Sequence, residues 1–495
     1  MNVAMILEMA ADALGDRIAF GNRDDGLTYG QMRGTARAVA QRVVGDHDQV
    51  TSVALMEPLS ELVPATLFGA AWAGVTYAPL NYRLPDQQLN DLLDRLQPTV
   101  VAAPHWVESK HDVELDYPPA PERPAVLLFT SGTSAAPKAA ILSHTQLLSY
   151  VMNTLEPFSA GEDEAAIVSV PPFHIAGVAS VLSSTWIGRR IVPLPRFSPE
   201  EWIDTVRREG ITHATVVPTM LDRIVAVMEA NPDARVPSLR NLAYGGSRMH
   251  VSVLERALRL MPETDFVNAY GLTETSSTVA LLGPDDHRLA LYSDEPMFKK
   301  RLESVGQPIP GIEVRIVDDQ GTEQAPDTAG EILIRGAQVS GEYVGTDSKV
   351  DADGWLHTGD RGWLDVEGYL FCEGRADDTI IRGGENIGPA EIENALLQHD
   401  AIATAAVVGL PDEGAWGEKI AAMLVLAPGV VEVDFDNVRE FIRERVGTLK
   451  TPEIFDTCDE LPQTGSGKVL RRQVRDDFLA QLAGGADAGE SAAEE

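Results

Sequence analysis

Residues 129–144, FTSGTSAAPKAAILSH, place hydroxyl groups, a glycine and a lysine between an apolar run, AVLL, and the segment TQLLSYVMNTL. Threonine and serine hydroxyls, backbone N–H groups and a lysine ammonium all suit a cluster of anionic oxygens such as a phosphate. The segment is not a Walker loop, because Pro137 stands where that motif requires its second glycine. Local sequence therefore predicts either a phosphate-binding loop between a strand and a helix, or an ordinary polar loop.

Five further stretches carry residue types that suit nucleotide chemistry. They are NLAYGGSRMH (241–250), NAYGLTETSS (268–277), GWLHTGDRGWLD (354–365), GRADDTIIRGGENIGPAEIE (374–393) and LPQTGSGKVLRR (461–472). Paired glycines in the first let a planar ligand approach the backbone, and the second joins an aromatic ring, a hydroxyl and a carboxylate. Taken singly, each has an ordinary alternative: Asp360 as a turn residue, Glu274 as a helix cap, and Lys468 as a surface lysine.

Alternating strand-like and helical patterns predict the elements that position these stretches. TSVALM (51–56) precedes a helical LVPATLFGAAWAG, and THATVVP (212–218) precedes a helix. In that helix Leu221, Ile224, Val225 and Met228 recur at helical spacing. This alternation predicts an α/β fold. From about residue 305, short alternating strands between Asp-, Gly- and Pro-rich turns predict a small antiparallel sheet.

The segment after residue 375 predicts a small α+β domain. Pro389 fits the first position of a helix, and Val438, Phe441 and Ile442 form one face of another. We therefore divide the chain into an N-terminal domain (1–375), a C-terminal domain (376–482) and an acidic tail (483–495). The composition of that tail, AGGADAGESAAEE, predicts disorder.

Composition limits the classes of partner. The 495-residue chain has a formal net charge of −35, which disfavours nucleic acids and anionic membrane surfaces as partners. Its two cysteines, Cys372 and Cys458, exclude a disulfide framework. The first 16 residues have no basic residue and predict an amphipathic helix rather than a signal peptide, and no apolar run approaches the length of a membrane span. We therefore expect a cytoplasmic protein without integral membrane association.

Taken together and in this order, the six stretches resemble the adenylate-forming superfamily, which comprises acyl- and aryl-CoA synthetases, luciferases and peptide-synthetase adenylation domains. The resemblance runs from about residue 20 to about residue 475. The opening loop is similar to the superfamily's phosphate loop, T-S-G-T-T-G-x-P-K-G. The resemblance implies an N-terminal domain that binds a carboxylic acid and ATP, and a mobile C-terminal lid domain.

The resemblance implies roles for the matching residues in binding ATP and Mg²⁺. The residues that would hold the β- and γ-phosphates are Thr130, Ser131, Gly132, Thr133 and Lys138. Adenine would lie over Gly245 and Gly246, with Tyr270 on its other face. Thr273 would contact the α-phosphate and Glu274 would bind Mg²⁺, while Asp360 and Arg375 would hold the ribose hydroxyls.

The resemblance also implies how the C-terminal domain works. Lys468 matches the catalytic lysine, and Asp377 matches the hinge about which this domain turns. The turn would bring the RGGEN face, with Gly383 and Gly384, towards the acyl-adenylate. Trp416 resembles part of a W-G-E segment of many CoA ligases, so it lies either near the CoA entrance or at a buried anchor of the small domain.

The acid side of the site is less specific. PPFHIAG (171–177) resembles the P-x-F-H-x-x-G of acyl and aryl ligases, which places His174 beside the acid. Peptide-synthetase domains carry an aspartate after that phenylalanine, and its absence here favours a plain carboxylic acid over an amino acid. Small and aliphatic side chains in TVVPTM, AYGGS and STVALL suit an apolar acid, either fatty or aromatic.

Three positions depart from the superfamily pattern. Ala135 and Ala139 replace glycines of the phosphate loop, and Gly388 stands where CoA ligases often have tyrosine. The leading hypothesis is an ATP-dependent acid–CoA ligase that releases AMP and pyrophosphate. The alternatives are a ligase that passes the acyl group to a carrier protein or an amine, and a catalytically silent homologue. A homodimer is left open.

Overall fold

We describe the protein from a computed structural model, which describes residues 2–46, 49–108, 124–130, 137–382, 385–412, 417–464 and 468–490. The chain forms two compact units. The first unit comprises Met1–Arg315, Leu333–His357 and Glu367–Leu370, and the second comprises Ile316–Ile332, Thr358–Val366 and Phe371–Glu495. Among the helices described, none combines the length and apolar character that a bilayer span requires.

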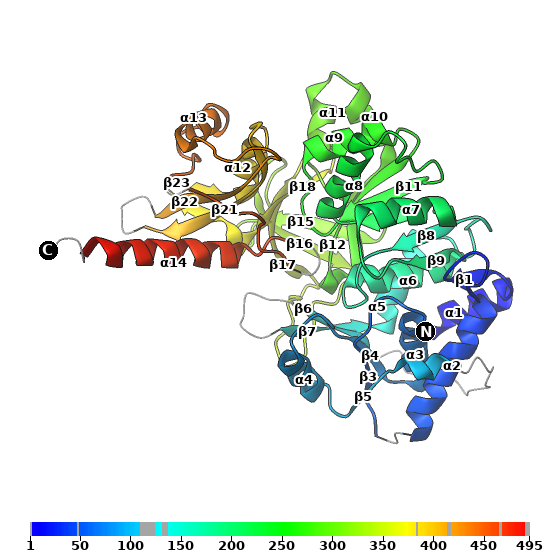
Figure 1. The fold of residues 1–495 in the computed structure, drawn as a ribbon. Coiled ribbons are helices and arrows are strands. Elements are labelled where there is room, and N and C mark those ends of the chain that lie inside the picture. The colour runs from blue at the N-terminus through cyan, green and yellow to red at the C-terminus, as the bar shows by residue number, and fades with distance from the viewer. Residues whose placement is uncertain are drawn as a thin grey trace. The chain divides into compact units, whose positions relative to one another are not determined.

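A nine-stranded, mostly parallel sheet forms the centre of the first unit (Figure 1). In spatial order its strands are β14 (Gln307–Pro308), β13 (Ser277–Leu282), β12 (Asp265–Leu272), β11 (Asn241–Gly245), β10 (His213–Val216), β8 (Ala165–Val168), β9 (Arg190–Pro193), β1 (Ile18–Phe20) and β2 (Leu27–Thr28). The run from β12 to β1 is parallel, and β13, β14 and β2 are antiparallel additions at the edges.

A second sheet of five strands lies in the same unit. Its spatial order is β5 (Thr99–Val101), β3 (Ser52–Leu55), β4 (Thr76–Pro79), β6 (Pro124–Thr130) and β7 (Lys138–Ser143). The last strand corrects the sequence analysis, which expected the phosphate loop to lead directly into a helix. Instead β6 and β7 form an antiparallel pair, and the helix starts only at His144. Along Lys138–Ser143, buried and partly buried side chains do not alternate strictly. The period of two was therefore too weak in this segment to distinguish a strand from the start of a helix.

Helices connect and cover the two sheets. They are α1 (Ala4–Leu14), α2 (Tyr29–Asp46), α3 (Leu62–Ala73), α4 (Asp86–Arg95), η1 (Pro104–Val107), α5 (His144–Thr154), α6 (Ile175–Ile187), α7 (Pro199–Glu209), α8 (Pro218–Ala230), α9 (Val251–Leu260), η2 (Thr273–Thr275), α10 (Pro284–Tyr292) and α11 (Pro296–Arg301). Helices α7, α8 and α9 pack in a row beside the nine-stranded sheet (Figure 1). One continuous apolar core contains side chains from both sheets and from α1, α2, α3 and α6. The helix expected at the N-terminus is confirmed as α1.

The antiparallel sheet expected after residue 305 is also present. It has four strands in the order β15 (Ile312–Val317), β16 (Gly330–Gly336), β17 (Leu356–Leu364) and β18 (Leu370–Arg375). The division between the two compact units runs through this sheet. A short turn, η3 (Ala376–Asp378), and a two-stranded ribbon, β19 (Ile380–Arg382) and β20 (Glu385–Ile387), follow it.

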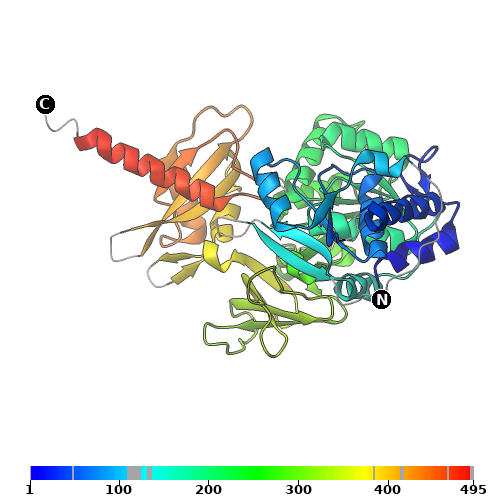
Figure 2. The same ribbon diagram turned by 90° about the horizontal axis from the view of Figure 1, so that it is seen from below.

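The rest of the second unit is a three-stranded sheet between helices (Figure 2). Its elements are β21 (Ile402–Pro411), β22 (Glu418–Leu426), β23 (Ile454–Thr457), α12 (Pro389–Leu396), α13 (Phe435–Val446) and α14 (Arg471–Glu490). Alternate residues of β21 and β22 face opposite sides: one set packs with α12 and α13, and the other packs with Val474 and Phe478 of α14. The predicted α+β segment and the mixed α/β fold are therefore confirmed.

The end of the chain differs from the expected disordered tail. Helix α14 continues to Glu490, and residues 491–495 lie outside the described part of the chain. Alanine and glutamate favour a helix, and α14 is already anchored upstream by buried Val474 and Phe478. The predicted boundary at residue 375 remains a prediction, although the continuous part of the second unit starts nearby at Phe371.

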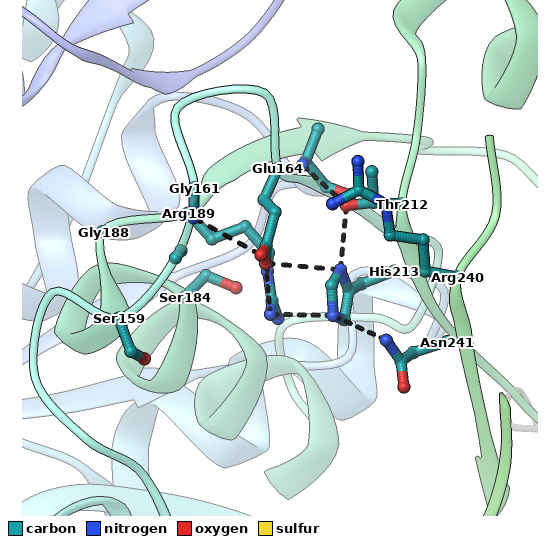
Figure 3. A network of polar contacts seen from close by, with 12 residues as sticks. Ser159, Gly161, Glu164, Ser184, Gly188, Arg189, Thr212, His213, Arg240 and Asn241 are labelled. Atoms are coloured by element: carbon teal, nitrogen blue, oxygen red, sulfur yellow. Dashed lines mark hydrogen bonds and ion pairs between the residues drawn. The ribbon is translucent and has the colours of Figure 1, made fainter.

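A polar network fixes the amino ends of the parallel strands in the first unit (Figure 3). Glu164, just before β8, accepts hydrogen bonds from Arg189, just before β9, at 2.9 and 3.2 Å. His213, the first residue of β10, contacts Thr212, Arg189 and Asn241. Burial, followed by the charge of Arg189, lowers the pKa of His213 to about 4. The neutral ring fits this network, because one nitrogen donates to Thr212 while the other accepts.

Candidate active site

The predicted site residues of the first unit gather at the other edge of the same sheet, the carboxyl ends of its parallel strands. His174 follows β8, Pro218 follows β10, Gly246 follows β11 and Thr273 follows β12. These strands are neighbours in the order β12-β11-β10-β8, so the four segments lie in a row. Ligands in open α/β sheets bind at this edge. Of the three apolar segments expected to line the acid pocket, TVVPTM runs from the end of β10 into α8, AYGGS ends β11, and STVALL forms β13.

Glu274, next to Thr273 in this row, is a buried acidic side chain. It lies in η2 and its side chain is only 9% exposed. The hydroxyl of Tyr343 donates a hydrogen bond to Oε1, and the ammonium of Lys349 lies 3.1 Å from the same oxygen. Burial alone would raise the pKa of this carboxyl, but the Tyr343 hydroxyl and the Lys349 charge hold it below its ordinary value. Glu274 is therefore a buried anion.

One short segment, residues 340–344, links the turn with Glu274 to the strand that follows the phosphate loop. Ser340 N–H donates to the carbonyl oxygen of Glu274 at 2.7 Å. On its other side, Ile141 N–H donates to Glu342 O and Val344 N–H donates to Ala139 O, both at 2.9 Å. This pairing joins the turn with Glu274 to β7, whose first residue is the predicted phosphate ligand Lys138.

Only the two ends of the phosphate loop can be placed. Thr130 ends β6 and lies opposite Lys138, and its hydroxyl donates to the Lys138 carbonyl at 3.3 Å. Ser131, Gly132 and Thr133, together with Ala135, lie outside the described residues. The structure thus fixes where the loop leaves and rejoins the sheet, and the phosphate contacts stay a prediction.

The glycine pair at the end of β11 has a structural explanation. A Cβ atom on Gly245 would lie 2.2 Å from the carbonyl oxygen of Ala269 on the neighbouring β12, so this position accepts only glycine. Gly246 has a φ of +84°, in the region that favours glycine. Tyr270 lies on β12 next to Ala269, half-buried. The three predicted adenine contacts therefore belong to adjacent strands, and their role in binding adenine stays a prediction.

His174 is placed by aromatic neighbours. It precedes the first residue of α6, and its ring centroid lies 4.7 Å from that of Phe173. Phe173 in turn meets the Tyr82 ring edge-on at 5.6 Å. This cluster is apolar except at the imidazole and the phenol, which suits an acid with an apolar body and a polar end.

The second unit contains the other predicted residues. Arg375 Nε lies 3.1 Å from Asp360 Oδ1, and Arg375 Nη1 donates to the Thr358 carbonyl at 2.7 Å. Asp360 follows Gly359, whose φ of +71° turns β17 at this point, and its side chain is 8% exposed. The structure therefore brings together the pair predicted to hold the ribose, although their binding of ribose stays a prediction.

Lys468 and Asp377 are exposed residues of the second unit. Lys468 lies at the end of a loop closed by mutual hydrogen bonds with Thr464, from Lys468 N–H to Thr464 Oγ1 at 3.1 Å and from Thr464 N–H to Lys468 O at 2.7 Å. Asp377 lies in η3, directly after β18. Gly383, Gly384 and Trp416 lie outside the described residues, so their predicted contacts with CoA are untested.

The sequence analysis missed Tyr343 and Lys349. Both lie in SGEYVGTDSK (340–349), a stretch that matches none of the six quoted motifs. Their partner Glu274 is about 70 positions earlier in the chain. No local pattern could have paired them.

The donor set around Glu274 fits Mg²⁺. Within the described ranges, no group of three or more histidine, cysteine or acidic side chains could hold a metal by itself. Mg²⁺ in nucleotide sites is bound by one or two carboxylates, with phosphate oxygens and water completing its shell. A single ionised carboxylate beside the strand that ends the phosphate loop meets this requirement.

Comparisons with known proteins identify the family of the chain. Residues 7–344 match the AMP-binding enzyme family, and residues 391–468 match its C-terminal domain. The chain is 32% identical to a fatty acid–[acyl-carrier-protein] ligase from Streptomyces coeruleorubidus, over 92% of each chain. It is also 32% identical to an indoleacetate–CoA ligase from Aromatoleum aromaticum, over 92% of this chain and 94% of the relative.

Among solved structures, o-succinylbenzoate CoA synthetase from Bacillus subtilis, in complex with its acyl-adenylate, matches with a TM-score of 0.83. The two sequences are 27% identical, over 95% of this chain and 97% of that one. The resemblance inferred from the six motifs is confirmed. The chain belongs to the AMP-binding enzyme family, the adenylate-forming enzymes.

Proposed function

We propose that the protein is an ATP-dependent carboxylic acid–CoA ligase that acts through an acyl-adenylate and releases AMP and pyrophosphate. The observation that carries this proposal is the connection of Glu274 to the phosphate-loop strand through residues 340–344. It joins the predicted metal ligand to β7, whose first residue, Lys138, is a predicted triphosphate ligand. The CoA-ligase relatives of similar length support the thiol as acceptor.

In the first half-reaction, the substrate carboxylate attacks the α-phosphorus of ATP and pyrophosphate leaves. Two anions must approach one another, so the protein must neutralise charge and align the groups. Glu274 would hold Mg²⁺, which when bound would supply Lewis-acid stabilisation of the phosphate charge. Lys138 and the loop hydroxyls hold the leaving diphosphate, Thr273 contacts the α-phosphate, and the ammonium of Lys468 meets the charge that builds on the transferred group.

In the second half-reaction, the CoA thiol attacks the acyl carbonyl and AMP leaves. This step needs no cation at the α-phosphate. We propose that rotation of the C-terminal domain at Asp377 withdraws Lys468 and presents the Gly383–Gly384 face to the acyl-adenylate. Lys468 belongs to the second compact unit, whose continuous part begins at Phe371, a few residues before Asp377.

A specific observation favours a second candidate, transfer to a carrier protein. One relative with the same coverage is a fatty acid–[acyl-carrier-protein] ligase. Gly388 stands at the start of α12, where CoA ligases often have tyrosine. This glycine departs from the CoA-ligase pattern, so the pattern does not by itself fix CoA as the acceptor.

One experiment identifies the acid and separates the acceptors. Pyrophosphate exchange into ATP is measured across a panel of fatty and aryl acids, and at least one acid should support exchange. With that acid, CoA should then accelerate AMP release and yield the thioester. If acyl-AMP accumulates and only a carrier protein accelerates AMP release, the second candidate is correct. No exchange with any acid would indicate a catalytically silent homologue.

We infer a cytoplasmic location, because ATP and CoA are supplied there and a chain with only two cysteines does not build a disulfide framework. The homodimer that the sequence left open stays a prediction. Sedimentation of the purified protein would decide it.

A further inference from the structure

The contact between Lys349 and Glu274 needs an explanation beyond metal binding. Lys349 Nζ lies 3.1 Å from Glu274 Oε1 and 5.3 Å from the centre of the Tyr343 ring. The residue is also held by its backbone: its N–H donates to Gly341 O at 2.9 Å, and its carbonyl accepts from His357 N–H at 3.0 Å. The ammonium is thus directed at the carboxylate from a fixed point of the chain.

This contact places a positive charge where the metal must bind. A Mg²⁺ ion lies about 2.1 Å from its oxygen ligands, so on Glu274 Oε1, which is 3.1 Å from the ammonium, it would lie within about 5 Å of that charge. A dication and an ammonium at this separation repel each other strongly in a partly buried site. The side chain of Lys349 is 38% exposed, which leaves it room to turn away from the carboxylate.

We propose that Lys349 is an internal competitor of the metal: it occupies Glu274 in the nucleotide-free enzyme and must leave when Mg²⁺ binds. The inference rests on the proposed function, in which Glu274 is the metal ligand. It predicts that metal alone binds weakly. The triphosphate offers the displaced ammonium new anionic partners, so metal and ATP bind together more favourably than either alone.

The test measures Mn²⁺ binding to the nucleotide-free protein by the EPR signal of the free ion. A chain with a net charge of −35 will bind Mn²⁺ loosely at its surface, so each titration is compared with the same protein carrying Glu274→Gln. The difference isolates the site at Glu274. Salt near physiological strength screens the surface contribution further.

Removing the ammonium should strengthen metal binding. We expect Lys349→Met to lower the Kd of the Glu274-dependent site for Mn²⁺ by about tenfold, or ~1.4 kcal/mol. Lys349→Arg keeps the charge and should keep the weak binding. Lys419→Met is the matched control, because it removes an ammonium that pairs with Asp412 at 2.9 Å and should leave Mn²⁺ binding unchanged. Lys349→Gln replaces Lys349→Met if the latter does not fold.

The outcomes separate the inference from the proposed function. If Glu274→Gln removes a metal site and Lys349→Met binds Mn²⁺ no more tightly than the wild type, only the role of Lys349 is wrong. If Glu274→Gln changes nothing in any background, Glu274 is not the metal ligand, and both the inference and that part of the proposed function are wrong.

Discussion

His287 should make the stability of the first unit fall steeply in mild acid. Its ring is fully buried between the Tyr244 hydroxyl, 2.8 Å from Nε2, and the Gly283 carbonyl oxygen, 2.6 Å from Nδ1. A neutral imidazole satisfies both, with Nδ1–H donating and Nε2 accepting. Burial lowers the pKa of His287 to about 4, although the Gly283 carbonyl and Asp286 favour the protonated ring and Arg288 opposes it.

The sign and size follow from linkage. The pKa of His287 is lower in the folded protein than in the unfolded chain, so the unfolded chain takes up the proton first as pH falls. Between the unfolded value of 6.5 and the folded value of about 4, each pH unit therefore removes up to about 1.4 kcal/mol of stability. From pH 7 to pH 5 the loss from His287 alone is about 2 kcal/mol.

The assay is urea unfolding of the wild type and of His287→Gln at pH 7 and at pH 5. The variant should be less stable at pH 7, because it loses part of the buried hydrogen bonding, but its stability should depend less on pH by about 2 kcal/mol. Burial also lowers the pKa of His144 and His213 to about 4, and both remain in each protein, so their contributions cancel. Equal pH dependence of the two proteins would refute the reasoning.

Three further predictions concern the site. Lys468→Ala should slow adenylation by several orders of magnitude while thioester formation from supplied acyl-AMP largely survives; equal loss in both half-reactions would contradict the moving-domain proposal. Asp360→Ala should raise the KM for ATP about tenfold in pyrophosphate exchange with a smaller change in kcat, and an unchanged KM would contradict its role at the ribose. Gly245→Ala should destabilise the first unit by about 2 kcal/mol or more in urea unfolding, because the new Cβ would overlap the Ala269 carbonyl oxygen. Gly246→Ala should cost only about 1–2 kcal/mol, because it meets no atom closer than 3.8 Å and pays only for its φ; equal costs would count against the steric explanation.

Local patterns in the sequence predicted the elements well where burial follows a simple period. Leu221, Ile224, Val225 and Met228 are all buried on one face of α8, as their helical spacing requires. Pro389 starts α12, because its fixed φ suits a first helical turn. Strand β7 was missed for the opposite reason, since its register is set by pairing with β6 and with residues 342–344 rather than by its own periodicity.

The residues of the candidate site also fall into those that a motif predicts and those that only tertiary contacts bring in. Motif matching selected Asp360 and Arg375 separately, and the structure brings them within 3.1 Å. It selected Glu274 but not Tyr343 or Lys349, because those contacts depend on how residues 340–349 fold back on η2. Residue types in a motif can predict the groups that contact a ligand. The side chains that position those groups come from distant parts of the chain, so no local sequence spacing predicts them.

The acidic composition of the chain disfavours ATP binding, and the ion pairs of Glu274 and Asp360 reduce this effect. A chain with a net charge of −35 should repel ATP, and two of its acidic residues, Glu274 and Asp360, are predicted to contact the nucleotide and its metal. Yet Glu274 and Asp360 each have a cation within about 3.1 Å, Lys349 for the first and Arg375 for the second. Each carboxylate is thus neutralised by its own cation before any ligand binds. At such short distances the electrostatic effect of this ion pair exceeds that of distant surface charges, which salt screens. In the proposed function, Glu274 and Asp360 are therefore each paired with a cation before ATP binds, and Lys349 is the cation that the metal would displace.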